Sequence, residues 1–124
     1  MATIITREVV GGKAILNGRP LAEWLPEVVD LIVERFSPEM VISFGSVAGG
    51  TDGPDSDIDV LVVFSDLPGR HHDVATSILQ ALDDLPVPVD VMVTDQGEIA
   101  SKGSLPGMLR VAMREGRVVY SRSD

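Results

Sequence analysis

The stretch from Phe44 to Phe64, FGSVAGGTDGPDSDIDVLVVF, holds the residues of this chain best suited to chemistry. Asp57 and Asp59 stand two positions apart where an apolar strand begins. The period of a strand therefore points both side chains to one face, with Cα atoms about 6.5 Å apart. Two carboxylates on such a face repel each other and lose hydration, and a divalent cation is the usual compensation. Oxygen ligands of this kind select Mg²⁺ or Mn²⁺.

A third carboxylate, Asp90, lies in the later apolar run PVDVMV. If that run forms a strand beside the one carrying Asp57 and Asp59, the three side chains form one cluster. Three carboxylates can hold two cations about 3.5–4 Å apart, which is the arrangement used for in-line nucleotidyl transfer. One metal ion would then carry a triphosphate and the other would activate an attacking hydroxyl, with Asp90 placed to accept its proton.

A glycine–serine pair, Gly45-Ser46, precedes the acidic motif by ten residues. Glycine lets the backbone approach a phosphate closely, and the serine hydroxyl can bond to a phosphate oxygen. The N–H groups of a turn or helix that starts directly after the pair would add donors. The pair alone is a weak signal, but Gly-Ser, ten residues and Asp-x-Asp on a strand together predict a nucleotide site.

The elements that must position these residues alternate between helices and strands. Apolar spacing predicts a helix from Leu21 to Phe36 that either kinks at Pro26 or begins near Leu25. Strands are predicted at 40–44, 58–64, 87–94 and 118–120, helices at 72–85, 96–101 and 105–115, and a loop at 47–56. This alternation predicts an α/β (α+β) domain with a small mixed β-sheet flanked by helices. Residues 19–124 form that domain, and residues 1–18 are an N-terminal extension that can form a β-hairpin, with arms at 3–10 and 13–16.

Composition narrows the class of protein further. The 124 residues carry 10 basic and 19 acidic side chains, a formal charge of −9, which argues against direct nucleic-acid binding and against an anionic membrane surface. Cysteine is absent, which excludes disulfide scaffolds and thiolate metal sites. No apolar run approaches the ~18 residues of a membrane span, and the N-terminus lacks signal-peptide features, so we expect a cytoplasmic location.

Together, Gly45-Ser46, residues 47–56 and Asp57-Ile58-Asp59 resemble the signature of the DNA polymerase beta-like nucleotidyltransferase superfamily. The chain is similar to the minimal (MNT) branch of that superfamily over most of its length. The resemblance implies the nucleotidyltransferase fold and a reaction in which AMP passes from ATP to a hydroxyl with two Mg²⁺ ions. It implies that Asp57, Asp59 and Asp90 are the catalytic metal ligands, and that Gly45 and Ser46 hold the triphosphate.

Several members of the minimal branch are antitoxins that adenylylate a tyrosine of a HEPN-domain ribonuclease toxin. The resemblance therefore implies a HEPN-type toxin as partner and acceptor, in a homo- or hetero-oligomer. One departure concerns the family pattern x-Ala-Arg-Gly after Gly-Ser, because this chain has Gly49 in the place of the arginine. Two alternatives stay open: an antitoxin that acts by stoichiometric binding with weak or no catalysis, and a small-molecule nucleotidyltransferase.

Other acidic and histidine groups are interpreted as structural. Asp52 and Asp55 are expected to form turns, since a Ca²⁺ loop starting at Asp55 would have Val60 where a glycine is needed. The pair His71-His72 is predicted to lie in a solvated first helical turn. Four acids of the first helix share one face that we interpret as solvated: Glu23, Glu27, Asp30 and Glu34.

Overall fold

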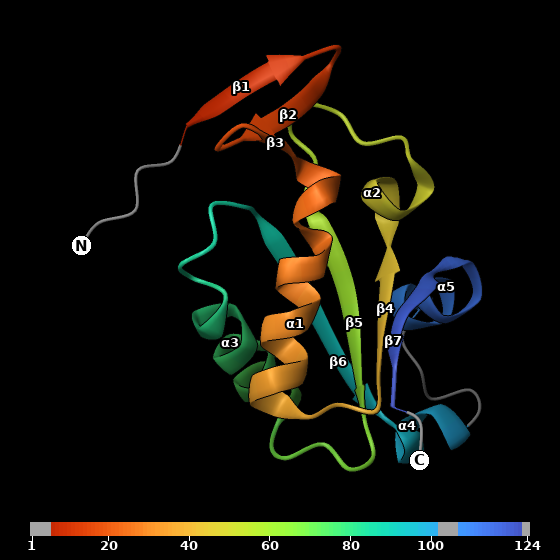
Figure 1. Ribbon diagram of the computed structural model, residues 1–124. Coiled ribbons are helices and arrows are strands. Elements are labelled where there is room, and N and C mark those ends of the chain that lie inside the picture. The colour runs from red at the N-terminus through yellow and green to blue at the C-terminus, as the bar shows by residue number, and fades with distance from the viewer. Residues whose placement is uncertain (1–5, 102–106, 123–124) are drawn as a thin grey trace.

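The computed structural model describes residues 6–101 and 107–122, which form two sheets and the helices that cover the larger one (Figure 1). The small sheet consists of β1 (Arg7–Val10), β2 (Lys13–Leu16) and β3 (Arg19–Pro20), in that order. β1 and β2 form the predicted antiparallel hairpin, and β3, which was not predicted, pairs with β2. Residues 3–5 of the predicted first arm lie outside the described residues.

The large sheet has the strand order β6-β5-β4-β7. Its strands are β4 (Met40–Phe44), β5 (Ile58–Phe64), β6 (Val89–Asp95) and β7 (Arg117–Ser121). β4 is antiparallel to both β5 and β7, whereas β5 and β6 are parallel, so the sheet is mixed as predicted. The predicted bounds of β4 and β5 are those found, and the ends of β6 and β7 differ by one or two residues.

The helices are η1 (Leu21–Trp24, one 3₁₀ turn), α1 (Leu25–Phe36), α2 (Gly45–Gly49), α3 (His71–Ala81), α4 (Gln96–Ala100) and α5 (Gly107–Glu115). α1 begins at Leu25, because Pro26 is tolerated in the first helical turn, where its missing N–H costs no hydrogen bond. α3 ends at Ala81, earlier than predicted, because the chain continues in turns that include Asp83 and Asp84. α2 corrects the prediction of a loop from residue 47, and residues 105–106 of the predicted last helix lie outside the described part.

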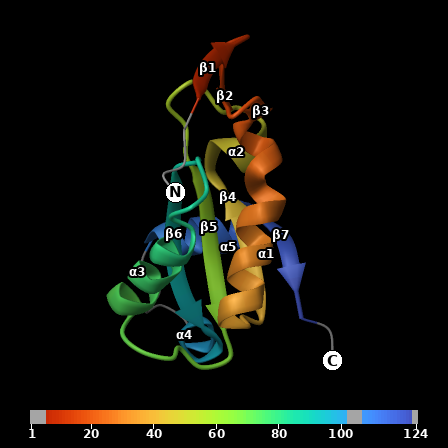
Figure 2. The same cartoon turned by 60° about the vertical axis from the view of Figure 1, so that its left-hand side comes forward.

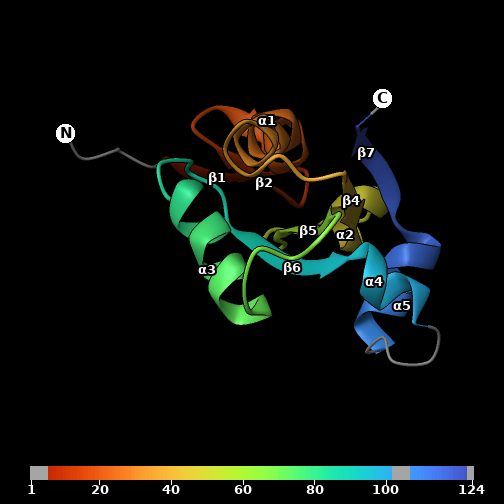
Figure 3. The same cartoon turned by 90° about the horizontal axis from the view of Figure 1, so that it is seen from below.

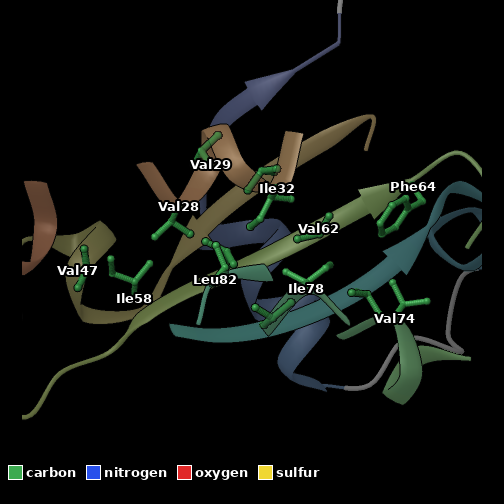
Figure 4. Close-up of a cluster of buried hydrophobic side chains, with 14 of the residues drawn as sticks. Val28, Val29, Ile32, Val47, Ile58, Val62, Phe64, Val74, Ile78 and Leu82 are labelled. Carbon is green, nitrogen blue, oxygen red and sulfur yellow. The ribbon is translucent and has the colours of Figure 1, made fainter. Parts of the chain in front are cut away.

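Apolar side chains cover both faces of the large sheet. On one face, alternate residues of the central strands pack against α1 and α3, and Figure 4 shows these side chains converging. On the other face, Leu61 and Val63 of β5 pack with Leu109 and Ala112 of α5. Figure 3, a view from below, shows α1 and α5 on opposite sides of the sheet. Asp59 is the one residue of β5 that is not buried, and strand alternation places it on the α5 face.

The small sheet lies at the end of the large sheet where β4 ends and β5 begins (Figures 1 and 2). Trp24 joins η1 to β2, since its Nε1 donates to the Leu16 carbonyl at 3.0 Å. Arg19 lies over the Trp24 ring, 4.4 Å from the centroid, and forms an ion pair with Glu27 at 2.8 Å. Glu27 is therefore paired, while the other three acids of the predicted solvated face are exposed as expected. None of the helices within the described residues has both the length and the apolar character needed to cross a membrane.

Candidate active site

The parallel pairing of β5 and β6 places Asp59 directly opposite Asp90. Residues opposite each other in a sheet direct their side chains to the same face, and neighbouring strands lie about 4.8 Å apart. Asp57 lies two residues before Asp59, just ahead of the first residue of β5. The structure thus makes β5 and β6 neighbours in the register that a joint site for these acids requires.

The three carboxylates differ in exposure and influence one another. Asp59 is half-buried, whereas Asp57 and Asp90 are exposed. Burial raises the pKa of Asp59 above its ordinary value, and the negative charges of Asp90 and Asp57 raise it further. Asp57 and Asp90 are therefore near enough to repel the charge of Asp59, and a bound cation would relieve that repulsion.

The carboxylates do not form a compact ligand cage in this structure. Among the described residues, no three acidic or histidine side chains are gathered closely enough to hold a metal ion as they stand. Asp57 and Asp90 are exposed, so their side chains can change rotamer toward a cation while Asp59 stays fixed by its strand. The donor set consists of two carboxylates on one sheet face and a third just before β5, and carboxylate oxygens fit a hard divalent cation such as Mg²⁺. The metal-ligand role of these three residues stays a prediction.

Gly45 begins α2 directly after β4, and two features of its position require a glycine. Its φ of +76° lies in the left-handed region, where an L side chain is strained. A Cβ at this position would also overlap the Asp59 carboxylate. Phe44, the last residue of β4, pairs with Asp59 in the sheet, so strand pairing brings the Gly45 backbone against the acid. The glycine and the acidic halves of the motif therefore lie side by side.

The hydroxyl of Ser46 faces the loop that leads from α2 to β5. Ser46 Oγ donates to Ser56 Oγ at 3.0 Å, and the backbone N–H of Gly53 donates to the same Ser56 oxygen at 2.8 Å. These bonds connect α2 to the residue directly before Asp57. Ser56 was not predicted as a site residue, because nothing in its local sequence separates it from an ordinary loop serine. The predicted phosphate contact of Ser46 stays a prediction.

The small sheet is attached to this loop through two basic residues. Lys13 Nζ lies 3.2 Å from Asp52 Oδ1, and the Asp52 side chain is only 3% exposed. Arg7 donates to the Pro54 carbonyl and lies 3.2 Å from Asp55, whose side chain is 96% exposed. The interpretation of Asp52 as a turn former is therefore wrong, because its buried carboxylate pairs with the hairpin instead. The N-terminal extension thus helps to hold the loop that precedes the acidic motif.

A pocket of about 490 Å³ opens beside Asp59, within the range of small-molecule sites. Its lining comes from the motif region and from the C-terminal elements: Phe44, Gly45, Ala48, Gly49, Asp59, Val111, Glu115 and Arg117. Gly49 has room for a side chain, since the nearest atom to an added Cβ is Thr51 Oγ1 at 3.8 Å. Arg117 was not singled out from the sequence, because only the antiparallel pairing of β7 with β4 brings it to this end of the sheet.

The mixed sheet, with Gly45 packed against Asp59 and with Asp90 in register beside it, has the arrangement that the sequence predicted for a nucleotidyltransferase. The chain belongs to the nucleotidyltransferase domain family, whose model matches residues 25–119. The matched segment contains β4, α2, β5, β6 and α5, whereas the small sheet lies outside it.

Two solved structures share the fold. A candidate nucleotidyltransferase from Sulfolobus solfataricus is 25% identical, with a TM-score of 0.58, covering 82% of this chain and 81% of that chain. A chain from a toxin–antitoxin structure with AMP-PNP is 22% identical, with a TM-score of 0.52, covering 78% of this chain and 73% of that chain. No curated protein sequence is significantly similar to this chain.

Proposed function

We propose that this protein is a Mg²⁺-dependent nucleotidyltransferase that transfers AMP from ATP to a hydroxyl group of a partner protein and releases pyrophosphate. The observation that carries the proposal is the register that sets Asp59 opposite Asp90, with the Gly45 backbone against Asp59. Membership of the nucleotidyltransferase domain family supports the reaction class. AMP-PNP in the toxin–antitoxin structure of the same fold supports an adenine nucleotide and a toxin as partner.

The proposed roles follow from the position of each residue. Asp57, Asp59 and Asp90 would hold two Mg²⁺ ions, or Mn²⁺, through their carboxylate oxygens. Bound Mg²⁺ would neutralise the triphosphate and lower the pKa of the acceptor hydroxyl. Asp90, exposed at the edge of the cluster, would take the proton from that hydroxyl. Gly45 would let the nucleotide approach the backbone, and Ser46 would exchange its bond to Ser56 for one to a phosphate oxygen.

The proposed acceptor is a hydroxyl of a HEPN-type toxin, which would enter the pocket from solvent. The surface next to the pocket supports the proposal that the acceptor is a protein. Val118 and Val119 of the edge strand β7 are 57% and 37% exposed and line a second hollow beside α2. Exposed apolar side chains beside a reactive centre are typical of protein-binding surfaces. That hollow shares Ala48 and Arg117 with the pocket beside Asp59, so a partner seated there would lie next to the pocket.

The test is intact-mass spectrometry of the neighbouring gene's product after incubation with this protein, ATP and Mg²⁺. We expect a gain equal to one AMP residue, which is lost when a chelator replaces Mg²⁺ and when the enzyme carries Asp59→Asn. Asp66→Asn is the matched control, because it removes an exposed carboxylate beyond the end of β5. An equal adduct yield from Asp59→Asn, or no adduct with the wild-type protein, would contradict the proposed transfer.

A second candidate function is an antitoxin that binds its toxin without catalysis. It is favoured by Gly49, which leaves the end of α2 without a guanidinium, and by the exposed valines of β7. The double variant Asp57→Ala, Asp59→Ala separates the two functions in a growth assay with the co-expressed toxin. Catalysis predicts that the double variant loses protection, whereas stoichiometric binding predicts that protection is kept.

A further inference from the structure

The pocket beside Asp59 is lined by more acidic than basic side chains. Its charged lining among the described residues consists of Asp59, Glu115 and Arg117. Arg117 is thus the one cationic side chain of that lining, in a chain whose formal charge is −9. A nucleotide polyphosphate carries several negative charges, so its binding in an acidic pocket requires positive charge from the protein as well as from metal ions.

The guanidinium of Arg117 is available for such a ligand. Within the described part of the chain, Arg117 forms no ion pair and no side-chain hydrogen bond. Neither Asp59 nor Glu115 therefore holds it, although both line the same pocket. Recruiting this side chain to a phosphate breaks no existing contact, which keeps the cost of binding low.

The backbone of Arg117 is held in place although its side chain is exposed. Arg117 begins β7 and pairs with Ser43 of β4. The preceding residue, Gly116, packs so closely that a Cβ there would overlap the Ala112 carbonyl and the Ile42 side chain. α5, Gly116 and β4 together therefore fix the backbone of Arg117, and this residue lines both the pocket and the hollow beside Val118 and Val119.

Gly49 and Arg117 lie on the lining of the same pocket. We propose that Arg117 binds the phosphate chain of the nucleotide and supplies, from β7, the guanidinium that the end of α2 lacks. The planar guanidinium can bond two phosphate oxygens at once, which gives orientation as well as affinity. This inference rests on the proposed nucleotidyltransferase function and adds a residue to its nucleotide site.

The test is calorimetric titration of the full chain with AMP-PNP and with AMP, both in Mg²⁺. We expect Arg117→Gln to weaken AMP-PNP binding by about 10- to 100-fold, the range for a charge-assisted hydrogen bond. AMP, which lacks the β- and γ-phosphates, should bind the variant nearly as well as the wild-type protein. Arg110→Ala is the matched control, because it removes one exposed arginine of α5 that does not line the pocket.

Each outcome separates this inference from the proposed function. A wild-type protein that binds neither nucleotide overturns both. Wild-type binding that Arg117→Gln leaves unchanged overturns only the role of Arg117. Equal weakening of AMP and AMP-PNP would mean that Arg117 supports the fold or contacts only the part that the two ligands share, and either result would overturn a role at the β- and γ-phosphates.

A second variant tests the same point by gain of binding. A Cβ added at Gly49 would make only an ordinary van der Waals contact, so Gly49→Arg can place a guanidinium in the lining of the same pocket. In the Arg117→Gln background, we expect Gly49→Arg to recover most of the lost AMP-PNP affinity. A folded double variant that recovers none would show that positive charge in this pocket does not govern binding, and would count against the proposal.

Discussion

Replacing Asp59 by asparagine should make the protein more stable and at the same time abolish its response to Mg²⁺. Asp59 is half-buried on β5, and its pKa is raised by burial and by the charges of Asp90 and Asp57. Ionised Asp59 therefore costs folding free energy when no cation is bound. Asparagine has nearly the same shape and carries no charge, so the substitution removes this cost.

The size of the effect follows from the spacing typical of side chains on neighbouring strands. If the neighbouring carboxylates lie about 6 Å from Asp59, each repulsion is about 0.7–1.4 kcal/mol at an effective dielectric constant of about 80 to 40. Exposure of Asp57 and Asp90 and screening by salt reduce the sum of the two to about 1 kcal/mol. For a domain of this size, that stabilisation corresponds to a rise in Tm of about 3–5 °C.

The effect depends on pH with a definite sign. Because the pKa of Asp59 is raised in the folded state, the folded protein takes up the proton at a higher pH than the unfolded chain. The gain in free energy of unfolding that Asp59→Asn brings over the wild-type protein is therefore complete above the folded-state pKa. It shrinks as the pH falls through that value toward 3.8, the ordinary value of the group.

The assay is denaturant unfolding at several pH values, with and without Mg²⁺. We expect Mg²⁺ to stabilise the wild-type protein but not Asp59→Asn. Added Mg²⁺ should therefore narrow or reverse the difference in free energy of unfolding between the two proteins. Asp66→Asn serves as the control, since it removes an exposed charge outside the cluster. The reasoning fails if Asp59→Asn gains no more stability than Asp66→Asn, or if Mg²⁺ stabilises both variants equally.

Three further substitutions test the elements around the site. Gly45→Ala should destabilise the protein by more than about 1 kcal/mol in denaturant unfolding, because it combines a positive φ with an overlap on Asp59. Lys13→Ala should lower the free energy of unfolding by about 1–3 kcal/mol, because it leaves the buried carboxylate of Asp52 unpaired. Asp95→Ala should lower it by about 1 kcal/mol at neutral pH, because Asp95 caps α4. That last loss should disappear in acid, since backbone hydrogen bonds lower the pKa of Asp95 and its contribution is lost as the pH falls through the lowered value.

Each of these substitutions has a matched comparison. Gly50 has a φ of +74° with no atom within 4 Å of an added Cβ, so Gly50→Ala should cost less than the change at Gly45. Arg7→Ala breaks an ion pair with the exposed Asp55 and should cost less than about 0.5 kcal/mol. If Gly45→Ala and Gly50→Ala, or Lys13→Ala and Arg7→Ala, lowered the free energy of unfolding equally, the role given to close packing at Gly45 or to burial of Asp52 would be contradicted. A loss at Asp95 that persists unchanged at low pH would contradict its assignment as an ionised cap.

Local sequence patterns predicted most elements of the fold and the candidate site motif. The apolar run 58–64 and the run 40–44 fixed the bounds of β5 and β4, because burial on a sheet imposes its pattern on adjacent residues. Pro26 limited the start of α1 to two alternatives, one of which the structure shows. The spacing of Gly45-Ser46 and Asp57 likewise indicated a nucleotide site, since each half of the motif lies within one turn or strand.

Contacts between distant segments needed the tertiary structure. Which strands are neighbours, and in what register, decides that Asp59 faces Asp90, and strand pairing depends on the packing of the whole core. The same holds for Asp52, which the sequence predicted as a turn residue, whereas in the structure its carboxylate pairs with Lys13 of the hairpin. Arg117 reaches the pocket only because β7 returns to pair with β4. The sequence by itself thus determined which reactive side chains the chain carries and the local elements that hold them. The long-range pairing, which no local pattern encodes, decided how those groups are brought together.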